Sequence, residues 1–214
     1  MAKVISKQRL GAVLVRQFHN PTGVGGRLAG WVMARRRSNV ARSRWAVALL
    51  DVAPADRVLE IGCGPGVAIG ALAARATGGQ VVGVDRSDVM IGQARRRNSR
   101  AVRDGRVRLI ASAVEDLPAH GTPPFDLPFD AVLAINTVGF WTDPVSRLAE
   151  LRAYLAPGGR IALVSQPRGP GATASTSAAA ATELVELLAR AGFTGPRVET
   201  LALDPPAVCV LAST

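Results

Sequence analysis

One feature constrains the fold of this 214-residue chain more than any other: an apolar run at residues 58–61 that turns through three alternating glycines, Gly62, Gly64 and Gly66. An aliphatic run of this kind is typical of a strand, and the pattern after Gly66 is helical. Glycine lacks Cβ and adopts positive φ, so a ligand can approach the backbone closely. Such a turn aims backbone N–H groups and the positive end of the next helix at one point. We therefore expect an anionic group to bind there.

A carboxylate ends the next expected strand, at residues 80–85. Asp85 lies nineteen residues after Gly66, and a carboxylate at this place can accept hydrogen bonds from both hydroxyls of a ribose. Asp85 could instead cap the helix that is expected to begin near Ser87.

Two polar residues, Asn136 and Thr137, follow a third apolar strand at residues 129–135. Asn136 could be a turn residue or a ligand contact. Ligands of open α/β sheets bind beyond the carboxyl ends of the strands, where these residues, Asp85 and the glycine turn would be neighbours. Together they predict a site for a ribose-bearing ligand.

The glycine spacing decides between two classes of such ligand. A dinucleotide fingerprint needs G-x-G-x-x-G, but Val67 and Ile69 stand where the third glycine would be. The pattern is instead an acid, Glu60, followed by three alternate glycines. With Asp85 after it, this pattern resembles the class I S-adenosylmethionine-dependent methyltransferases. The resemblance covers the chain from about residue 55 to its end.

Four further stretches resemble the same family: the second-strand region at 83–90, the adenine loop at 115–118, the fourth strand at 129–132 and the turn into the fifth at 155–160. The resemblance implies methyl transfer, with S-adenosyl-L-methionine as cofactor and S-adenosyl-L-homocysteine as product. It also implies an α/β fold with a doubly wound, seven-stranded, mostly parallel sheet in the order 3-2-1-4-5-7-6, whose last strand is antiparallel.

The resemblance further implies roles for individual residues. Backbone N–H groups around Gly62 to Gly66 would meet the methionine carboxylate, and Glu60 would face the ammonium group. Asp85 would hold the ribose diol, and the main chain at Val114 would flank the adenine. The full expected cofactor-binding set is Glu60, Gly62, Cys63, Gly64, Gly66, Asp85, Arg86, Val114, Glu115 and Asn136.

The adenine loop departs from the family at one position. Similar sequences often carry an acid where this chain has Ala113. A side-chain contact to the adenine amine from that position is therefore in doubt, and Ser112, Glu115 or water could substitute.

Strand and helix patterns alternate from Asp56 onward, which predicts βαβ units and helices on both faces of the sheet. We expect a helical N-terminal cap or lid over residues 1–50 and a Rossmann-like S-adenosylmethionine-binding catalytic domain over 51–214. Strands are expected at 57–62, 80–85, 106–111, 129–135, 159–165, 197–203 and 207–213. Helices are expected near 66–77, 87–99, 143–155 and 179–192.

Three helices are expected in the cap. An i, i+4 apolar stripe predicts the first over residues 3–18, and Leu28, Trp31 and Val32 share one face of the second. The third would begin near Asn39, a suitable N-cap. We expect a flexible turn at 22–26, and a mobile loop at 166–180, where Gly, Pro, Ser, Thr and Ala dominate.

The net charge of +10 is unevenly placed. Residues 1–50 contain ten Lys or Arg and no Asp or Glu, while the rest of the chain has sixteen of each sign. A basic segment can bind RNA, membrane lipid or an acidic substrate. Arg outnumbers Lys 24 to 2, so coding bias on a solvated helix surface explains the charge equally simply.

A small-molecule acceptor is favoured for two reasons. Related enzymes that methylate amino groups of nucleic acids or proteins often carry an Asn-Pro-Pro-Tyr-type sequence after the fourth strand, and Asn136-Thr137-Val138-Gly139 stands there instead. No substrate-binding insertion is visible between the last strands. The lack of acids in residues 1–50 would suit an anionic acceptor.

No catalytic residue is identified by the sequence, and His19 and Trp141 are the candidates. Histidine titrates near neutral pH, so His19 or His120 could act as a general base, and either could instead be a surface residue. Of Phe140 and Trp141 we expect one to line the acceptor pocket and the other to pack under the following helix.

No metal site is expected, because two cysteines, Cys63 and Cys209, are too few for a cluster. The basic start lacks the apolar core of a signal peptide, and no apolar run spans a bilayer, so we expect a cytoplasmic protein. Peripheral membrane contact through the N-terminus and the oligomeric state stay open.

Two alternatives also stay open: an RNA methyltransferase that binds through the basic segment, and a non-catalytic S-adenosylmethionine-binding or membrane-surface protein. A nicotinamide-dependent oxidoreductase is disfavoured by the glycine spacing.

Overall fold

The computed structural model describes residues 23–118 and 121–214. The helix expected over residues 3–18, together with His19 and His120, lies outside the described residues.

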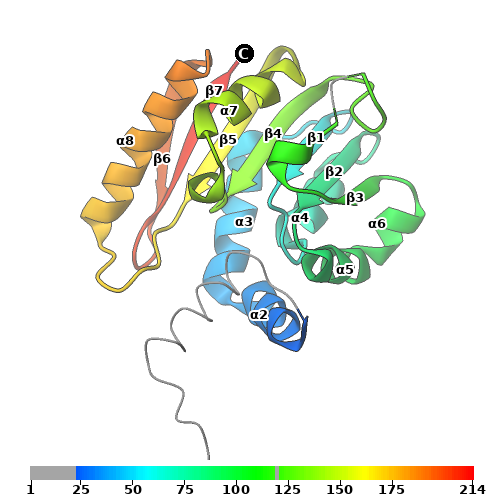
Figure 1. Ribbon diagram of the computed structural model, residues 1–214, viewed down its shortest axis with the longest axis horizontal. Helices are drawn as coiled ribbons and strands as arrows, with labels where there is room; N and C mark the ends of the chain where they lie inside the picture. Colours follow the sequence, from blue (N-terminus) through cyan, green and yellow to red (C-terminus); the bar gives the residue numbers. More distant parts are fainter. Residues whose placement is uncertain (1–22, 119–120) are drawn as a thin grey trace, which may run out of the picture.

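One seven-stranded sheet forms the centre of the molecule (Figure 1), and its strand order is β3-β2-β1-β4-β5-β7-β6. Strands β1 to β5 pair parallel with one another, and β7 runs antiparallel to both β5 and β6. The predicted fold class, strand order and antiparallel last strand are therefore confirmed. The strands are β1 (Arg57–Ile61), β2 (Gln80–Asp85), β3 (Val107–Ala111), β4 (Phe129–Ile135), β5 (Leu155–Ser165), β6 (Thr194–Leu201) and β7 (Ala207–Ser213).

Helices cover both faces of the sheet. The helices are α2 (Gly23–Arg35), α3 (Arg37–Leu50), α4 (Val67–Arg75), α5 (Asp88–Arg97), α6 (Ser99–Arg103), α7 (Pro144–Ala153) and α8 (Ala174–Arg190). Two short 3-10 helices, η1 (Val114–Asp116) and η2 (Val138–Phe140), follow β3 and β4.

Alternate residues of the central strands build two separate hydrophobic cores, because successive strand side chains point to opposite faces. Leu59, Val132 and Leu163 pack with α7 and α8 in one core. Val58 and Leu133 pack with α3, α4 and α5 in the other. The near-continuous apolar strands are buried on both faces, as parallel strands in a doubly wound sheet should be.

The boundaries of several elements differ from the sequence expectation. The region expected as a mobile loop at 166–180 contains the start of α8, where Thr173 and Thr176 form a capping box. Strand β5 begins earlier than expected, at Leu155, because the Pro-Gly-Gly stretch continues the strand. Strand β6 lies three residues earlier at its start than expected, at Thr194.

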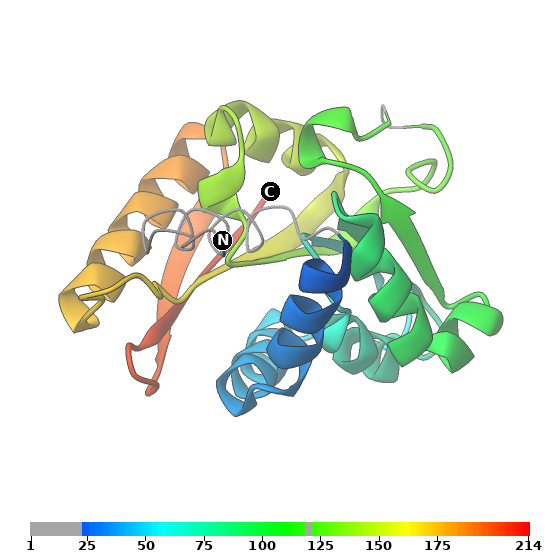
Figure 2. The ribbon, with the colours of Figure 1, turned by 60° about the horizontal axis from the view of Figure 1, so that its bottom comes forward.

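The turn expected at 22–26 is instead the beginning of α2, which packs on α5 and α3 (Figure 2). Gly30 makes that packing close: a Cβ at this position would lie 2.6 Å from Cε of Met90 and 2.3 Å from Oε1 of Gln93. The Gln93 side chain also donates to the carbonyl of Arg27 at 2.8 Å. Tertiary packing therefore overrides the weak helix propensity of the glycines.

Asn39 is not the N-cap of α3. The helix begins at Arg37 with Arg36 as its N-cap, and Asn39 lies buried within the first turn. Its side chain is engaged by arginines described below, which explains why it does not cap the helix.

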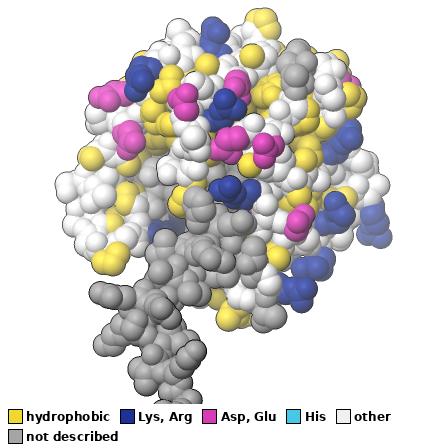
Figure 3. Space-filling model, in the orientation of Figure 1, with side chains coloured by type: hydrophobic (Ala, Val, Ile, Leu, Met, Phe, Trp, Pro, Cys, Tyr) yellow, Lys and Arg dark blue, Asp and Glu magenta, His cyan; other side chains and the backbone are white. Residues whose placement is uncertain are grey.

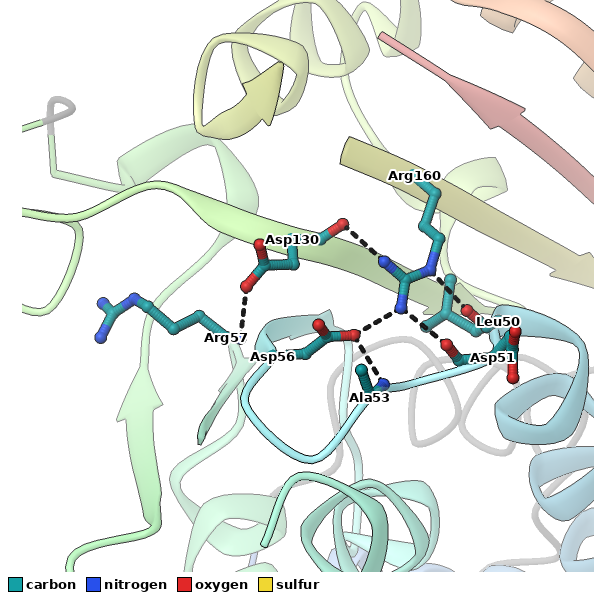
Figure 4. A network of polar contacts seen from close by, with 7 residues as sticks. All are labelled: Leu50, Asp51, Ala53, Asp56, Arg57, Asp130 and Arg160. Atoms are coloured by element: carbon teal, nitrogen blue, oxygen red, sulfur yellow. Dashed lines mark hydrogen bonds and ion pairs between the residues drawn. The ribbon is translucent and has the colours of Figure 1, made fainter. Parts of the chain in front are cut away.

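A polar network fixes the far end of α3 to the sheet (Figure 4). The guanidinium of Arg160 donates to the carbonyl oxygens of Leu50 at 2.7 Å and Asp51 at 2.8 Å. It also pairs with the Asp56 carboxylate and reaches the Asp130 carbonyl at 3.4 Å. The end of α3 is thereby tied to the residue before β1, the start of β4 and the middle of β5.

One face of the molecule is shown in Figure 3, where acidic and basic side chains are interspersed near the centre. Basic side chains gather over α5 and α6, whose last turns carry five arginines, Arg95, Arg96, Arg97, Arg100 and Arg103. In the part of the chain that the structure describes, no helix is long and apolar enough to cross a membrane.

Candidate functional site

A cavity of about 860 Å³ lies at the carboxyl ends of β1, β2, β4 and β5. Its walls also include residues of α2, α3 and α8. Pockets that hold small-molecule ligands have roughly 300–1,000 Å³. All members of the expected cofactor-binding set line this cavity except Gly66.

The three glycines of the turn after β1 have different structural roles, although all have positive φ. A Cβ on Gly62 would lie 2.6 Å from Oγ1 of Thr137, and one on Gly66 would lie 2.9 Å from Cα of Ala94. A Cβ on Gly64 would meet nothing within 4 Å. Gly62 and Gly66 therefore permit close packing of the protein on itself, and Gly64 is the glycine that leaves cavity space open.

The N–H groups of the turn are already engaged inside the protein. Those of Gly62 and Cys63 both donate to the carbonyl of Val84, at 2.8 and 2.9 Å. That of Gly64 donates to Oδ2 of Asp85 at 2.8 Å. A carboxylate that bound here would have to compete with these bonds or use other donors.

Glu60 presents a buried carboxylate to the cavity from β1. Its residue exposure is 3%, and Oε2 has no hydrogen-bond partner among the described residues. Burial raises the pKa of Glu60 well above its usual range, and the nearby Asp85 carboxylate raises it further. An unpartnered buried oxygen carries a desolvation cost, which a cationic ligand group would remove. The ammonium group of an amino acid fits this position.

Asp85 ends β2 at the edge of the same cavity. Oδ2 accepts from Gly64, and Oδ1 accepts from the N–H of Ser87 at 2.9 Å. Burial raises the pKa of Asp85, although these two hydrogen bonds oppose that effect. Ser87, whose Oγ accepts from the N–H of Met90, is the N-cap of α5. Each carboxylate oxygen of Asp85 has a further lone pair, so two hydroxyl groups can still bind.

The segment after β3 forms the wall expected to flank the adenine. The N–H of Ser112 donates to the carbonyl of Asp85 at 3.0 Å, which holds this segment beside β2. Val114 is buried, and Oε1 of Glu115 accepts from the N–H of Thr142 at 3.1 Å. Burial acts to raise the pKa of Glu115, but the Thr142 bond and nearby arginines outweigh it and lower the pKa.

Asn136 joins the ends of β4 and β5. Its φ of 55° is positive, its N–H donates to the carbonyl of Val164, and its Oδ1 accepts from the N–H of Gln166 at 2.7 Å. Asn136 also lines the cavity, so it is at once a turn residue and part of the site wall.

Phe140 and Trp141 both line the cavity. Trp141 also packs against the core shared with α7 and α8, whereas Phe140 is 48% exposed. The expected division into one packing and one pocket residue is therefore too simple. The catalytic candidate His19 lies outside the described residues, so Trp141 is the candidate that the structure places at the site.

Sequence reasoning did not single out the arginines at the other end of the cavity. Arg36 and Arg42, at the start of α3, and Arg168, after β5, all belong to its lining. Arg42 is only 6% exposed. It lies four and eight residues before the buried Ala46 and Leu50, so an arginine on the apolar stripe of α3 was the available signal.

The cavity therefore has two ends of opposite charge. We call the end with Glu60 and Asp85 the acidic end, and the end with Arg36, Arg42 and Arg168 the basic end.

Comparison with known proteins gives consistent results. The methyltransferase domain family matches residues 58–159. An uncharacterized methyltransferase of Bacillus subtilis, YdaC, is 27% identical over 186 residues, which are 86% of this chain and 97% of that protein.

Solved structures share the fold. An S-adenosylmethionine-dependent methyltransferase from Aquifex aeolicus aligns with a TM-score of 0.62 at 19% identity, over 80% of this chain and 88% of its own. The N-methyltransferase NodS from Bradyrhizobium japonicum, in complex with S-adenosyl-L-homocysteine, aligns with a TM-score of 0.64 at 17% identity, over 86% and 91% of the two chains.

Proposed function

Because the chain belongs to the class I S-adenosylmethionine-dependent methyltransferases, we propose that it methylates a small molecule bound beside the cofactor in the cavity. One observation carries this proposal. The expected cofactor-binding residues account for only part of the lining, and the rest comes from α2, α3, α8 and the segment after β5. That remaining space is lined by residues of this chain itself, which suits a small acceptor better than a macromolecular one.

The acidic end fits the two polar parts of S-adenosylmethionine. Glu60 would hold the ammonium group, which supplies the partner that Oε2 lacks within the described protein. Asp85 would hold the ribose diol, and the wall from Ser112 to Glu115 would flank the adenine. Gly64 would leave room for the part of the cofactor that crosses the turn.

Methyl transfer requires geometry more than acid–base chemistry. When bound, S-adenosylmethionine supplies a methyl group on a positively charged sulfonium, whose charge disappears as the nucleophile attacks in line. The protein's part is to hold the nucleophile about 3–3.5 Å from the methyl carbon and to exclude water. Apolar side chains such as Val138, Trp141 and Leu184 line the cavity and suit that task. A general base is needed only where the acceptor is protonated at the working pH.

The first helices would form the cover of the acceptor space. Residues of α2 and α3, including Val32 and Ser43, line the cavity. We propose that residues 1–50 act as a cap, with α3 as its fixed wall because its end is tied to Arg160.

Calorimetry with purified protein tests the cofactor part of the proposal. We expect heat on titration with S-adenosyl-L-homocysteine and none with NADH, and the reverse result would overturn the assignment. A screen of small acceptors by release of S-adenosyl-L-homocysteine then tests the acceptor class. Turnover of RNA, with steeply salt-dependent RNA binding, would contradict a small-molecule acceptor.

A further inference from the structure

The basic end of the cavity contains cations with no carboxylate to balance them. The guanidinium of Arg42 donates to Oε1 of Gln166 at 2.6 Å and to Oδ1 of Asn39 at 3.2 Å. That of Arg168 donates to the same two amide oxygens, at 2.8 and 2.7 Å. Two arginines therefore share two neutral acceptors, and we call these four residues the arginine cluster.

Of the two cations in this cluster, Arg42 is buried and Arg168 is exposed, and neither is paired with a carboxylate in the described part of the chain. No ion pair joins Arg42 or Arg168 to any carboxylate of the described residues. The undescribed residues, 1–22 and 119–120, contain no Asp or Glu, so they cannot supply one either. Glu183 of α8 lines the same cavity but is exposed and forms no ion pair with either arginine.

Arg42 in particular has an unsatisfied hydrogen-bond donor, its Nε–H group, within the described structure. It is 6% exposed, and its Nε has no hydrogen-bond partner among the described residues. Burial, together with the charges of Arg168 and Arg36, lowers the pKa of Arg42 to about 10. Isolated buried charges are normally paired, so an unpaired one that lines a cavity indicates that its partner is a ligand.

We propose that the arginine cluster, with Arg36 beside it, binds an oxyanion of the methyl acceptor, a carboxylate or a phosphate. This inference rests on the proposed function and names the class of its substrate: an anionic small molecule. Planar guanidinium groups match both anions through paired N–H donors.

The charge balance favours the acceptor as the source of that anion. The cofactor also carries one carboxylate, which could bind at this end because the N–H groups of the glycine turn are engaged. One carboxylate cannot balance Arg36, Arg42 and Arg168 together. An acceptor carboxylate or phosphate would add further negative charge at this end of the cavity.

Phosphate binding provides the test, and inorganic phosphate is the probe. In protein saturated with S-adenosyl-L-homocysteine, we expect phosphate to bind, and Arg168→Met to weaken that binding about tenfold or more, as expected for a lost charged hydrogen-bonding partner. Arg168→Lys should recover part of the affinity. Arg44→Met is the matched control, because Arg44 is exposed on α3 and does not line the cavity.

Each source of the anion gives a different result. Under the proposal, Arg168→Met leaves the affinity for S-adenosyl-L-homocysteine unchanged. If Arg168→Met weakens S-adenosyl-L-homocysteine instead, or if that ligand displaces phosphate from the wild-type protein, the cluster binds the cofactor's carboxylate and the acceptor assignment is wrong. Equal phosphate affinity in Arg168→Met and Arg44→Met, or no phosphate binding to the wild-type complex, also overturns it.

The proposed function can fail separately. Absence of S-adenosyl-L-homocysteine binding in the wild type would reject the methyltransferase cofactor, whatever phosphate does. An acceptor screen completes the test. It compares pairs of candidate acceptors that differ only in a carboxylate or the corresponding carboxamide. We expect the carboxylates to be turned over preferentially, and turnover of the carboxamides alone would exclude an anionic acceptor.

Discussion

The acidic and basic ends of the cavity are built in different ways. The acidic end comes from short contiguous segments, the turn after β1 and the end of β2, which adjacent parallel strands bring together. The basic end is assembled from α3 and the segment after β5, and its hydrogen bonds join residues 124 and 129 positions apart. A cofactor shared by a family can be held by a local motif, whereas an acceptor peculiar to one protein is held by residues that only the tertiary structure collects.

The largest effect should come from closing the acidic end. Gly64→Val places a branched side chain in the open space beside the turn, at a φ of +51° that branched residues rarely adopt. We expect the affinity for S-adenosyl-L-homocysteine to fall about hundredfold or more, by calorimetry.

Gly105→Val is the matched control for that variant. Gly105 also has a positive φ, of 75°, and open space around it, but it does not line the cavity. It should carry the same backbone strain and keep its ligand affinity. Equal ligand affinities in the two variants would show that the turn does not border the cofactor.

The ribose contact should come next. Asp85→Asn keeps the shape of the side chain but removes its charge and one acceptor oxygen. We expect a loss of about tenfold to hundredfold in S-adenosyl-L-homocysteine affinity, the range for charged hydrogen bonds. Asp88→Asn, an exposed carboxylate in the first turn of α5, should change little. Unchanged affinity in Asp85→Asn would mean that the ribose assignment is wrong.

The pH dependence of cofactor binding should report on Glu60. Its pKa in the free protein is raised, so it must release its proton to pair with an ammonium group. Affinity for S-adenosyl-L-homocysteine should therefore rise with pH through that raised pKa, by about threefold to tenfold, with proton release detected by calorimetry in buffers of different ionisation enthalpy. Glu60→Gln should flatten this dependence, and a slope that persists in the variant would assign it to another group.

The same pKa shift has a consequence for stability. A carboxyl whose pKa is higher in the folded than in the unfolded protein binds more protons when folded. Stability of the free protein should therefore fall as pH rises from the unfolded value of about 4.3 through the raised value. Glu60→Gln should be less sensitive than the wild type over that window.

The smallest effect is expected at the basic end in the absence of anions. Arg42→Met removes two hydrogen bonds but also removes an uncompensated buried charge, so the free energy of unfolding should change by only about 1 kcal/mol. Added phosphate should stabilise the wild type more than this variant, because a ligand stabilises only the form that binds it. A loss of about 3–5 kcal/mol on chemical denaturation would instead indicate a compensated buried pair.

The sheet order and the residues of the acidic end could be predicted from the sequence for one physical reason. The positions of Glu60, Gly64 and Asp85 follow from strands that the apolar pattern itself marks. The sequence did not predict the packing roles of Gly62 and Gly66, because these depend on Thr137 and Ala94 from elsewhere in the chain. It did not predict the basic end either.

Asn39 illustrates the second limit. Taken alone, an asparagine near the start of a helix indicates an N-cap. In the fold it lies between Arg42 and Arg168, and the second of these is 129 positions away. With 24 arginines in the chain, nothing in the sequence shows that Arg168 is the one that meets Arg42 here.

Because one end of α3 is attached to the sheet, the two ends of this helix have different roles. Arg160 fastens its last residues to the sheet, and Arg42 lies eight residues earlier, which is about 12 Å along the axis. Under the proposed acceptor site, substitutions in the first two turns of α3 should change which acceptor is recognised and leave the contacts of Arg160 with the end of the helix intact. Under that proposal, acceptor specificity could change through substitutions at the start of α3, while the cofactor-binding residues on the other side of the cavity stay the same.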